Sequence, residues 1–133
     1  RKLIHEKKLE KQVQLIGFRT DMNEILQTAD VFAFPSIREG LGIAAIEALA
    51  CGVPLIVAAN RGTREYLHND KNGLICDAFD RNAFVAAIDK VYSNVEYRKK
   101  LADYCRESVI QFSTEETVRT MERIYSTMDK RIS

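Results

Sequence analysis

Two glutamates eight positions apart, Glu39 and Glu47, flank a pair of glycines in the segment PSIREGLGIAAIEALACGVP, residues 35–54. Each carboxylate can accept hydrogen bonds from vicinal hydroxyls, so a sugar and a ribose are chemically suitable partners. At Gly40 and Gly42 the absence of a Cβ lets the backbone come close to a ligand. Eight residues of helical geometry leave the two carboxylates about 80° apart around the helix axis. Glu39 can thus meet one end of an elongated ligand and Glu47 the other.

The middle of such a ligand would lie against the start of a helix. The apolar residues 31–34 predict a buried parallel strand, and helical spacing begins near Gly42. Ligands of open α/β sheets bind outside the carboxyl ends of the strands. The first amides of a helix are unpaired and favour an anion such as a diphosphate. Glycine pairs also occur in ordinary strand-to-helix turns, and Glu47 can simply face solvent, so the spacing alone leaves both interpretations open.

The rest of the chain alternates strands with helices, which predicts a Rossmann-like α/β fold: a parallel sheet of about four strands with helices on both faces. Asp21 with Glu24, and Ser113 with Glu116, have the spacing of helix capping boxes. The highly charged residues 1–12 indicate a loosely held surface helix. The predicted strands are residues 13–18, 31–34, 55–59 and 74–76. The predicted helices are residues 22–29, 43–50 and 63–67 and three more, which Asp80, Asn94 and Ser113 cap.

Length and composition indicate one domain and disfavour several classes of protein. The chain has 133 residues, 46% of them hydrophobic, and a formal net charge of +1, which argues against a nucleic-acid partner. Cys51, Cys76 and Cys105 are far apart and odd in number, so we expect no disulfide framework and no zinc site, and a cytoplasmic location. No apolar run reaches the roughly twenty residues that cross a bilayer.

The run EGLGIAAIE, residues 39–47, resembles the Glu-x7-Glu signature of retaining glycosyltransferases of the GT-B fold, especially the family called group 1 or family 4. Other blocks are similar to the same family: IGFRTDMNEIL, ADVFAFPSIREGLG, EALACGVPLIV, RGTREYL, NGLIC and the pair IY near the end. The resemblance extends from about Val13 to Tyr125. It implies the nucleotide-sugar-binding, carboxyl-terminal domain of such an enzyme, truncated on its amino-terminal side. The parent enzyme would transfer a sugar from an NDP-sugar, which we expect to be a UDP-sugar, to a surface polysaccharide or lipid-linked acceptor.

The resemblance also implies roles for individual residues. Glu39, the candidate catalytic residue, would contact the donor sugar while the departing diphosphate is stabilised electrostatically. Glu47 would hold the ribose hydroxyls, and Ser36 would support the loop. No metal or other cofactor is implied, and the sequence contains no Asp-x-Asp. The candidate donor-binding residues are Gly40, Leu41, Gly42 and Ile43 through their amides, Glu47, and, with less support, Arg19 and Thr20 beside the base.

Two departures from the family limit what the chain is expected to do alone. Nothing before Val13 resembles the two strands that open the family's nucleotide-binding half, the first of which carries an arginine and a lysine for the diphosphate. We expect this chain to lack the acceptor-binding half, since no segment resembles it and neither His5 nor His68 matches its catalytic histidine. We therefore expect one partial donor-binding domain, inactive by itself. The free edges at residues 13–17 and 31–34 should pair with each other or between molecules.

Two other classes remain open. A non-hydrolysing sugar-nucleotide epimerase shares the fold and the donor, although it lacks the Glu-x7-Glu block. A non-catalytic nucleotide-binding or interaction module is the second. The basic residues among the first eleven would also let the parent enzyme lie against the inner face of an anionic membrane.

Overall fold

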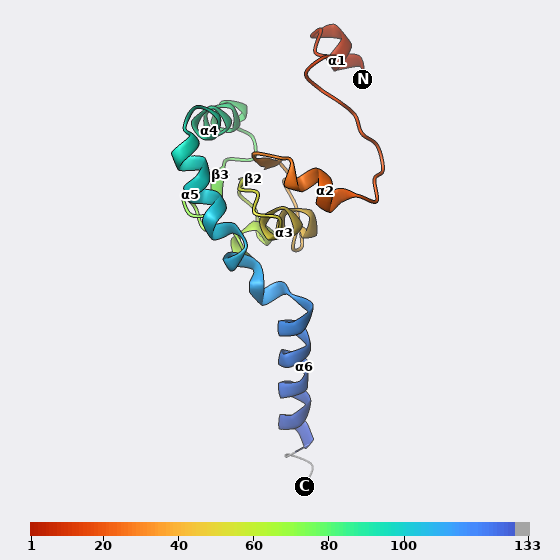
Figure 1. Ribbon diagram of the computed structural model, residues 1–133, viewed down its shortest axis with the longest axis vertical. Helices are drawn as coiled ribbons and strands as arrows, with labels where there is room; N and C mark the ends of the chain where they lie inside the picture. The colour runs from red at the N-terminus through yellow and green to blue at the C-terminus, as the bar shows by residue number, and fades with distance from the viewer. Residues whose placement is uncertain (130–133) are drawn as a thin grey trace.

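The computed structural model describes residues 1–129 and shows a small sheet enclosed by helices, with a helix projecting at each end of the chain (Figure 1). Strands and helices alternate through the body, as a parallel α/β fold requires. In chain order the elements are α1 (Lys2–Glu6), α2 (Met22–Gln27), β1 (Phe32–Phe34), α3 (Ile43–Ala50), β2 (Leu55–Ala58), the 3-10 helix η1 (Gly62–Glu65), β3 (Gly73–Cys76), α4 (Arg81–Ser93), α5 (Val95–Cys105), the 3-10 helix η2 (Glu107–Phe112) and α6 (Thr114–Asp129).

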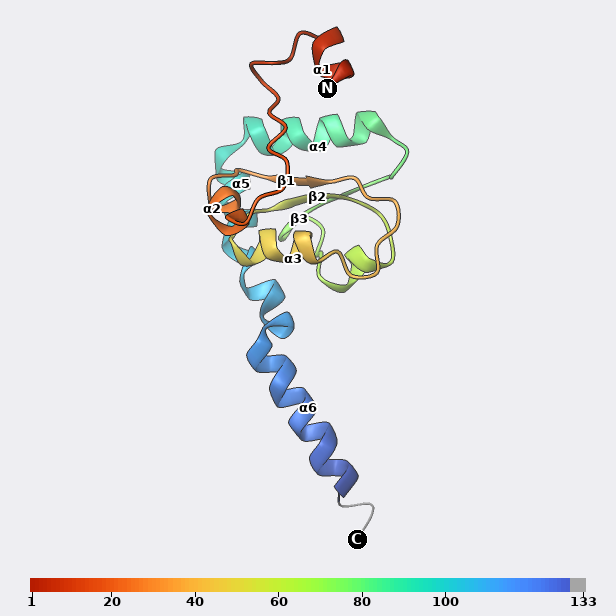
Figure 2. The same ribbon diagram turned by 90° about the vertical axis from the view of Figure 1, so that its right-hand side faces the viewer.

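The sheet has three parallel strands in the order β1–β2–β3. Phe32 lies opposite Leu55 in the register, and Leu55 lies opposite Gly73. Figure 2 shows α3 on one face of the sheet and α4 on the other. The predicted Rossmann-like α/β fold, with a parallel sheet covered by helices on both faces, is confirmed.

The core is divided by β2, the central strand, all four of whose residues are buried. Successive side chains of a strand point to opposite faces. Leu55 and Val57 accordingly pack in the cluster that includes α3, whereas Ile56 packs in the cluster that includes α4. The uninterrupted apolar run LIVA is typical of a strand covered on both faces. Because the strands are parallel, the carboxyl ends of β1 and β2 lie at the same edge of the sheet.

The strand predicted for residues 13–18 does not form, so the sheet has three strands and not four. Val13, Leu15 and Ile16 are exposed in an extended connection. The amide of Val13 is used in a local turn, where it donates to the carbonyl of Leu9 at 2.8 Å. Gly17 has φ +64°, which is outside the strand region. The prediction that this segment pairs beside β1 is therefore wrong. Pairing between molecules at the free edge of β1 stays a prediction, which light scattering can test.

Helix caps agree with the sequence at three of the four predicted positions. Asp80 accepts hydrogen bonds from the amides of Asn82 and Ala83, at 2.9 and 3.0 Å, and Asn94 accepts one from Tyr97 at 2.9 Å. At the start of α6 the amide of Glu116 donates to Ser113 Oγ at 3.2 Å. The side chain of Glu116 binds Arg119 at 2.6 Å, so the reciprocal bond of a capping box is not made.

Asp21 was the fourth predicted cap, and it caps nothing in the described chain. Its carboxylate binds the guanidinium of Arg19 from both oxygens, with Nε donating to Oδ1 at 2.7 Å. A charged partner two residues away competes with the neutral amides of the helix for the same acceptor. The pKa of Asp21 is lowered by this hydrogen bond with Arg19. Helix α2 accordingly begins without a side-chain cap and ends at Gln27, two residues earlier than predicted.

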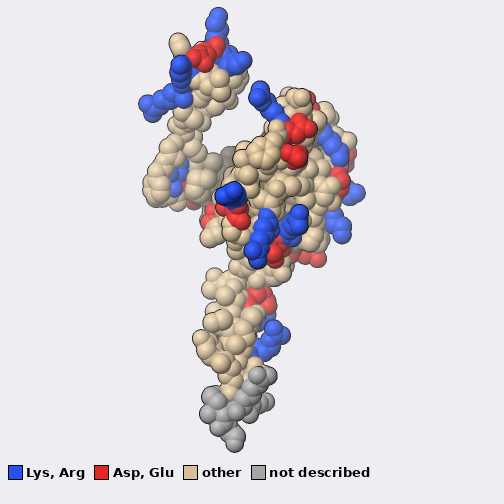
Figure 3. Space-filling model, turned by 180° about the vertical axis from the view of Figure 1, so that it is seen from behind, with Lys and Arg blue, Asp and Glu red and all other residues tan. Residues whose placement is uncertain are grey.

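The two ends of the chain lie away from the body. Helix α1 is shorter than predicted, with five residues and none of them buried. Figure 3 shows basic and acidic side chains intermingled over the body, which agrees with the near-neutral net charge. Helix α6 projects from the opposite end, and the apolar face that its spacing predicts is exposed at Val118, Met121, Tyr125 and Met128. No helix of residues 1–129 is long and apolar enough to span a membrane.

Candidate functional site

Glu39 lies half-buried in the loop that joins β1 to α3, at the carboxyl edge of the sheet. Ser36 Oγ donates a hydrogen bond to Glu39 Oε1 at 2.6 Å. The carbonyl of Ser36 in turn accepts a hydrogen bond from Asn60 Nδ2 at 2.8 Å. Asn60 follows β2, so two neighbouring strand ends cooperate to orient one carboxylate. Ser36, expected to support the loop, makes this contact directly.

Gly42 is the residue before α3, and its backbone is left-handed, with φ +78°. Its carbonyl accepts from the amides of Ala45 and Ile46 at 2.9 and 3.3 Å. No side chain of the described residues caps this helix. The amides of Gly42, Ile43 and Ala44 therefore lie at the positive end of the helix dipole with no helical carbonyl to bind. This is the arrangement that favours an anion.

The segment after β2 forms a floor beneath this turn. A Cβ added to Gly62 would lie 2.9 Å from the carbonyl oxygen of Gly40 and 3.0 Å from that of Glu39. A Cβ added to Gly42 would lie 2.8 Å from the hydroxyl of Tyr66. Glycine is needed at both positions because backbone or buried side chains fill the space. Figure 2 shows the short helix that contains Gly62 next to the start of α3.

Tyr66 is a site-adjacent residue that the sequence did not single out. Its side chain is fully buried, in the cluster that includes α3. Burial, together with the negative charge of Glu39, raises the pKa of the Tyr66 hydroxyl to about 12. The phenol is therefore protonated at neutral pH and can act as a donor. The only sequence signal for Tyr66 is that a tyrosine, with its polar hydroxyl, stands next to Leu67 in the segment RGTREYL, where an apolar residue would suit the core.

An open cavity of about 340 Å³ lies beside the turn, and it is lined by Ile37, Arg38, Glu39, Gly40, Asn60 and Arg61. Arg38 and Arg61 are exposed, and neither has an ion-pair partner within residues 1–129. Two guanidinium groups in the cavity that Gly40 also lines add positive charge at the carboxyl edge of the sheet, where an anion is expected. Sequence reasoning missed both arginines, although Arg61 comes three residues after the end of β2.

The structure brings only part of the predicted site together. Residues 39–43 form one continuous turn, and Glu47 is exposed one turn further along α3. Arg19 and Thr20 line a different cavity of about 440 Å³ with Phe18 and Asp21. This second cavity has no lining residue in common with the first. The guanidinium of Arg19 is also occupied by Asp21.

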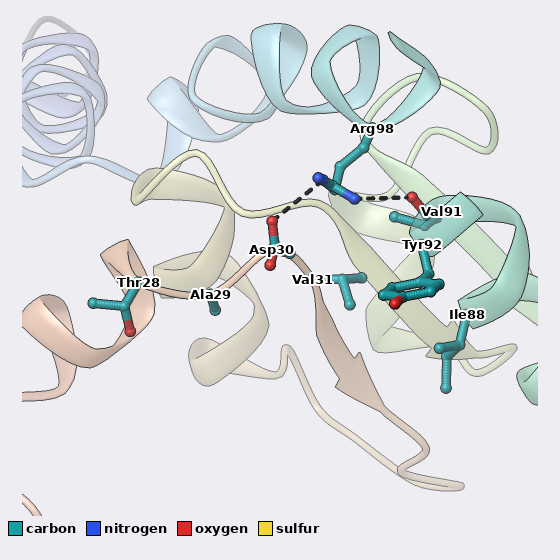
Figure 4. A pocket seen from close by; sticks show the side chains of 8 residues that line it. All are labelled: Thr28, Ala29, Asp30, Val31, Ile88, Val91, Tyr92 and Arg98. Atoms are coloured by element: carbon teal, nitrogen blue, oxygen red, sulfur yellow. Dashed lines mark hydrogen bonds and ion pairs between the residues drawn. The ribbon is translucent and has the colours of Figure 1, made fainter. Parts of the chain in front are cut away.

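A further cavity, of about 350 Å³, lies at the amino end of β1, and Figure 4 shows its lining. Arg98 Nε binds Asp30 Oδ1 at 3.3 Å, and Arg98 Nη1 donates to the carbonyl of Val91 at 3.3 Å. Its charged groups are thus matched to one another, and Tyr92 and Ile88 supply apolar walls. This cavity is at the opposite end of the strand from the usual position of ligands in parallel sheets.

Comparison with known proteins identifies the family. Residues 1–108 match the sequence profile described as "Glycosyl transferases group 1". The match begins earlier than the resemblance noted from the sequence, which began at Val13, and it ends before α6. The chain is 39% identical over 110 residues to the putative glycosyltransferase EpsD of Bacillus subtilis, covering 83% of this chain and 29% of that protein.

Solved structures agree with this assignment. A sucrose-phosphate synthase from Thermosynechococcus elongatus superposes with a TM-score of 0.86 at 28% identity, over 98% of this chain and 33% of that one. Anabaena HepE, in a complex with UDP, has the same fold, with a TM-score of 0.89 at 21% identity over 95% of this chain and 35% of that one. The chain thus spans about a third of the length of these proteins. It belongs to the group 1 glycosyltransferases and has the Rossmann-like architecture of their GT-B fold.

Proposed function

We propose that this chain is the donor-binding domain of a retaining hexosyltransferase that uses a UDP-sugar and needs no metal or other cofactor. The observation that carries the proposal is the turn at residues 39–42, where unpaired amides begin α3 beside a carboxylate oriented by Ser36. Complexes of the structural relative HepE with UDP and with UDP-glucose support a nucleotide-sugar ligand. A second domain, outside these residues, would supply the acceptor site, for a surface polysaccharide or a lipid-linked acceptor at the cytoplasmic face of a membrane.

In this proposal each part of the turn has a distinct task. The amides of residues 40–43 hold the diphosphate, and the dipole of α3 stabilises its charge as the glycosidic bond breaks. Glu39 accepts hydrogen bonds from hydroxyls of the donor sugar, and Ser36 keeps its carboxylate in position. Glu47 accepts hydrogen bonds from the ribose. Arg19 and Thr20 would have to approach the base through a rearrangement of the extended connection, because they line a separate cavity.

Titration with UDP, followed by amide chemical shifts, tests the location of the site. The largest shift changes should fall on residues 40–43, since their amides are the expected donors to phosphate. Uridine without phosphates is the matched control and should leave these amides nearly unchanged. Shift changes confined to α4, α5 and α6 would contradict the proposal.

Two substitutions separate the proposed roles of the glutamates in a complete enzyme that contains this domain. Glu47→Gln should weaken nucleotide binding by about 1–3 kcal/mol, the range for a hydrogen bond that involves a charged group. Glu39→Gln should lower kcat more than nucleotide affinity, because contacts with the sugar matter most while its bond breaks. UDP affinity and steady-state kinetics are the measurements. Equal losses of UDP affinity in both variants would refute this division.

A further inference from the structure

The hydroxyl of Tyr66 is a buried hydrogen-bond donor without an acceptor. Among the buried side-chain oxygen and nitrogen atoms of residues 1–129, it is the only one that has no hydrogen-bond partner. Buried polar groups are nearly always paired, because an unpaired one loses its bonds to water and gains none. An unpaired hydroxyl in a protein core therefore needs an explanation, and a functional partner is one of the standard ones.

The position of this hydroxyl suggests what its partner is. It lies against Gly42, 2.8 Å from the place where a Cβ would be, at the residue that begins α3. The charge of Glu39 acts on it strongly enough to contribute to the raised pKa of Tyr66. The ring is held by the surrounding core, with Phe34 also close to Gly42. The hydroxyl is thus held next to Gly42, the residue before α3, and it is protonated.

We infer that Tyr66 is a ligand-contacting residue of this site, and that its hydroxyl donates a hydrogen bond to a diphosphate oxygen bound at the amino end of α3. This inference rests on the proposed function, since the diphosphate belongs to the nucleotide sugar. The hydroxyl and the amides of Gly42 and Ile43 would then be donors to the same anion from two sides. Charge-assisted hydrogen bonds of this kind are the stronger ones.

Access to the hydroxyl requires the glycine turn to move. The hydroxyl lies next to Gly42, which has no side chain to displace. Gly40 has free space outside the turn, because a Cβ added there would meet nothing within 4 Å. Leu41, between the two glycines, is exposed. An outward shift of residues 40–42 on this solvent side would bring the hydroxyl within reach of the diphosphate.

The test is a Tyr66→Phe variant, titrated with UDP and with uridine, and compared with Tyr104→Phe. Tyr104 is a half-buried tyrosine of α5 that packs edge-on against His68 and is not among the nearest neighbours of Gly42, so its variant is a matched control. The inference predicts that Tyr66→Phe weakens UDP binding about tenfold and leaves uridine binding unchanged, because only the bond to phosphate is lost. Tyr104→Phe should bind both ligands as the wild type does.

A stability measurement separates this effect from a folding defect. Removing an unpaired hydroxyl from a ring of the same shape should leave the Tm of Tyr66→Phe equal to or above that of the wild type. Equal UDP affinities of the wild type and Tyr66→Phe would overturn the inference while leaving the proposed function intact. A wild-type chain whose residues 40–43 do not respond to UDP would overturn the proposed function, and the inference with it.

Discussion

The polar groups at the two ends of β1 differ in whether they have hydrogen-bond partners among the described residues. At the amino end, Arg98 binds both Asp30 and the carbonyl of Val91. The charges of that cavity are thus matched within the chain. At the carboxyl end, the amides that begin α3, the hydroxyl of Tyr66 and two guanidinium groups gather around one turn without acceptors among the described residues.

This difference distinguishes polar groups that stabilise the fold from polar groups that are available to a ligand. A matched pair such as Asp30 and Arg98 needs nothing from outside the molecule, and it holds α5 against the start of β1. Unmatched donors around Gly42 form a positive surface that an anion can complete. Parallel α/β sheets bind ligands at that end. The candidate site is therefore identified by its unpaired hydrogen-bond donors, and not by the size of a cavity.

The largest effect is expected from Gly62→Ala, which alters the floor of the carboxyl-end turn. The new Cβ would lie 2.9 Å from the carbonyl oxygen of Gly40, so backbone must move. We expect a loss of about 1–3 kcal/mol in the free energy of unfolding, as for other overpacked sites. UDP affinity should fall more than tenfold, because the displaced turn carries the amides. Urea unfolding and UDP titration measure the two effects.

Two controls accompany this variant. Gly40→Ala adds a methyl group that meets nothing within 4 Å, so its free energy of unfolding should stay within about 0.5 kcal/mol of the wild type. Asp30→Ala, at the other end of β1, should leave UDP affinity unchanged. If Gly62→Ala behaved like the wild type in both measurements, the close contact beneath the turn would have no role.

Elements with strong local signals were predicted well from the sequence. Helix α3 has the predicted bounds because Gly42 and Gly52 can adopt positive φ at its two ends. The caps at Asp80 and Asn94 depend only on residues two or three positions away. No strand forms at residues 13–18, although one was predicted there. The β-propensity of a segment says only that its residues fit a sheet, whereas a strand also needs a neighbouring strand to pair with.

In the candidate site, too, the sequence predicted local patterns but not contacts between distant segments. Glu39, Gly42 and Glu47 belong to one short run, so their pattern was visible in the sequence. The contacts that orient this run come from the segment after β2: Asn60 binds Ser36 across 24 positions, and Tyr66 meets Gly42 through the packed core. No local period encodes such contacts, and they were found only in three dimensions.

An intermediate effect is expected at alkaline pH, and it sharpens the contrast between the two ends. The folded pKa of Tyr66, about 12, lies above its ordinary value of 10.0. Ionisation of Tyr66 therefore has little effect on the free energy of unfolding well below pH 10, and it lowers this free energy as the pH rises from 10 through 12. Between pH 7 and pH 11, the free energy of unfolding of the wild type should fall by about 1.4 kcal/mol more than that of Tyr66→Phe. Urea unfolding at both pH values measures this.

Cys105 provides the control for the alkaline experiment. Burial raises the pKa of its thiol to about 12 from 9.0. The fall in the free energy of unfolding that Cys105 causes therefore begins one pH unit lower than the fall caused by Tyr66. Cys105→Ala should therefore reduce the pH dependence already between pH 9 and pH 10, by about 1 kcal/mol, where Tyr66→Phe departs from the wild type by only about 0.4 kcal/mol. Parallel curves for the wild type and Tyr66→Phe up to pH 12 would show that the hydroxyl is not buried in solution.

The smallest effect is expected at the amino end, from Asp30→Ala. The Arg98 side chain is 23% exposed and that of Asp30 is 76% exposed, so water and salt screen their attraction. Loss of such a pair costs about 0–1 kcal/mol, and the cost should shrink further at high salt. Arg98 keeps its hydrogen bond to the carbonyl of Val91, which limits the loss. Urea unfolding at low and high salt, with UDP titration beside it, checks this. A loss well above 1 kcal/mol, or a change in UDP affinity, would mean that the two ends of β1 are coupled, and the division between a self-sufficient end and a ligand-binding end would fail.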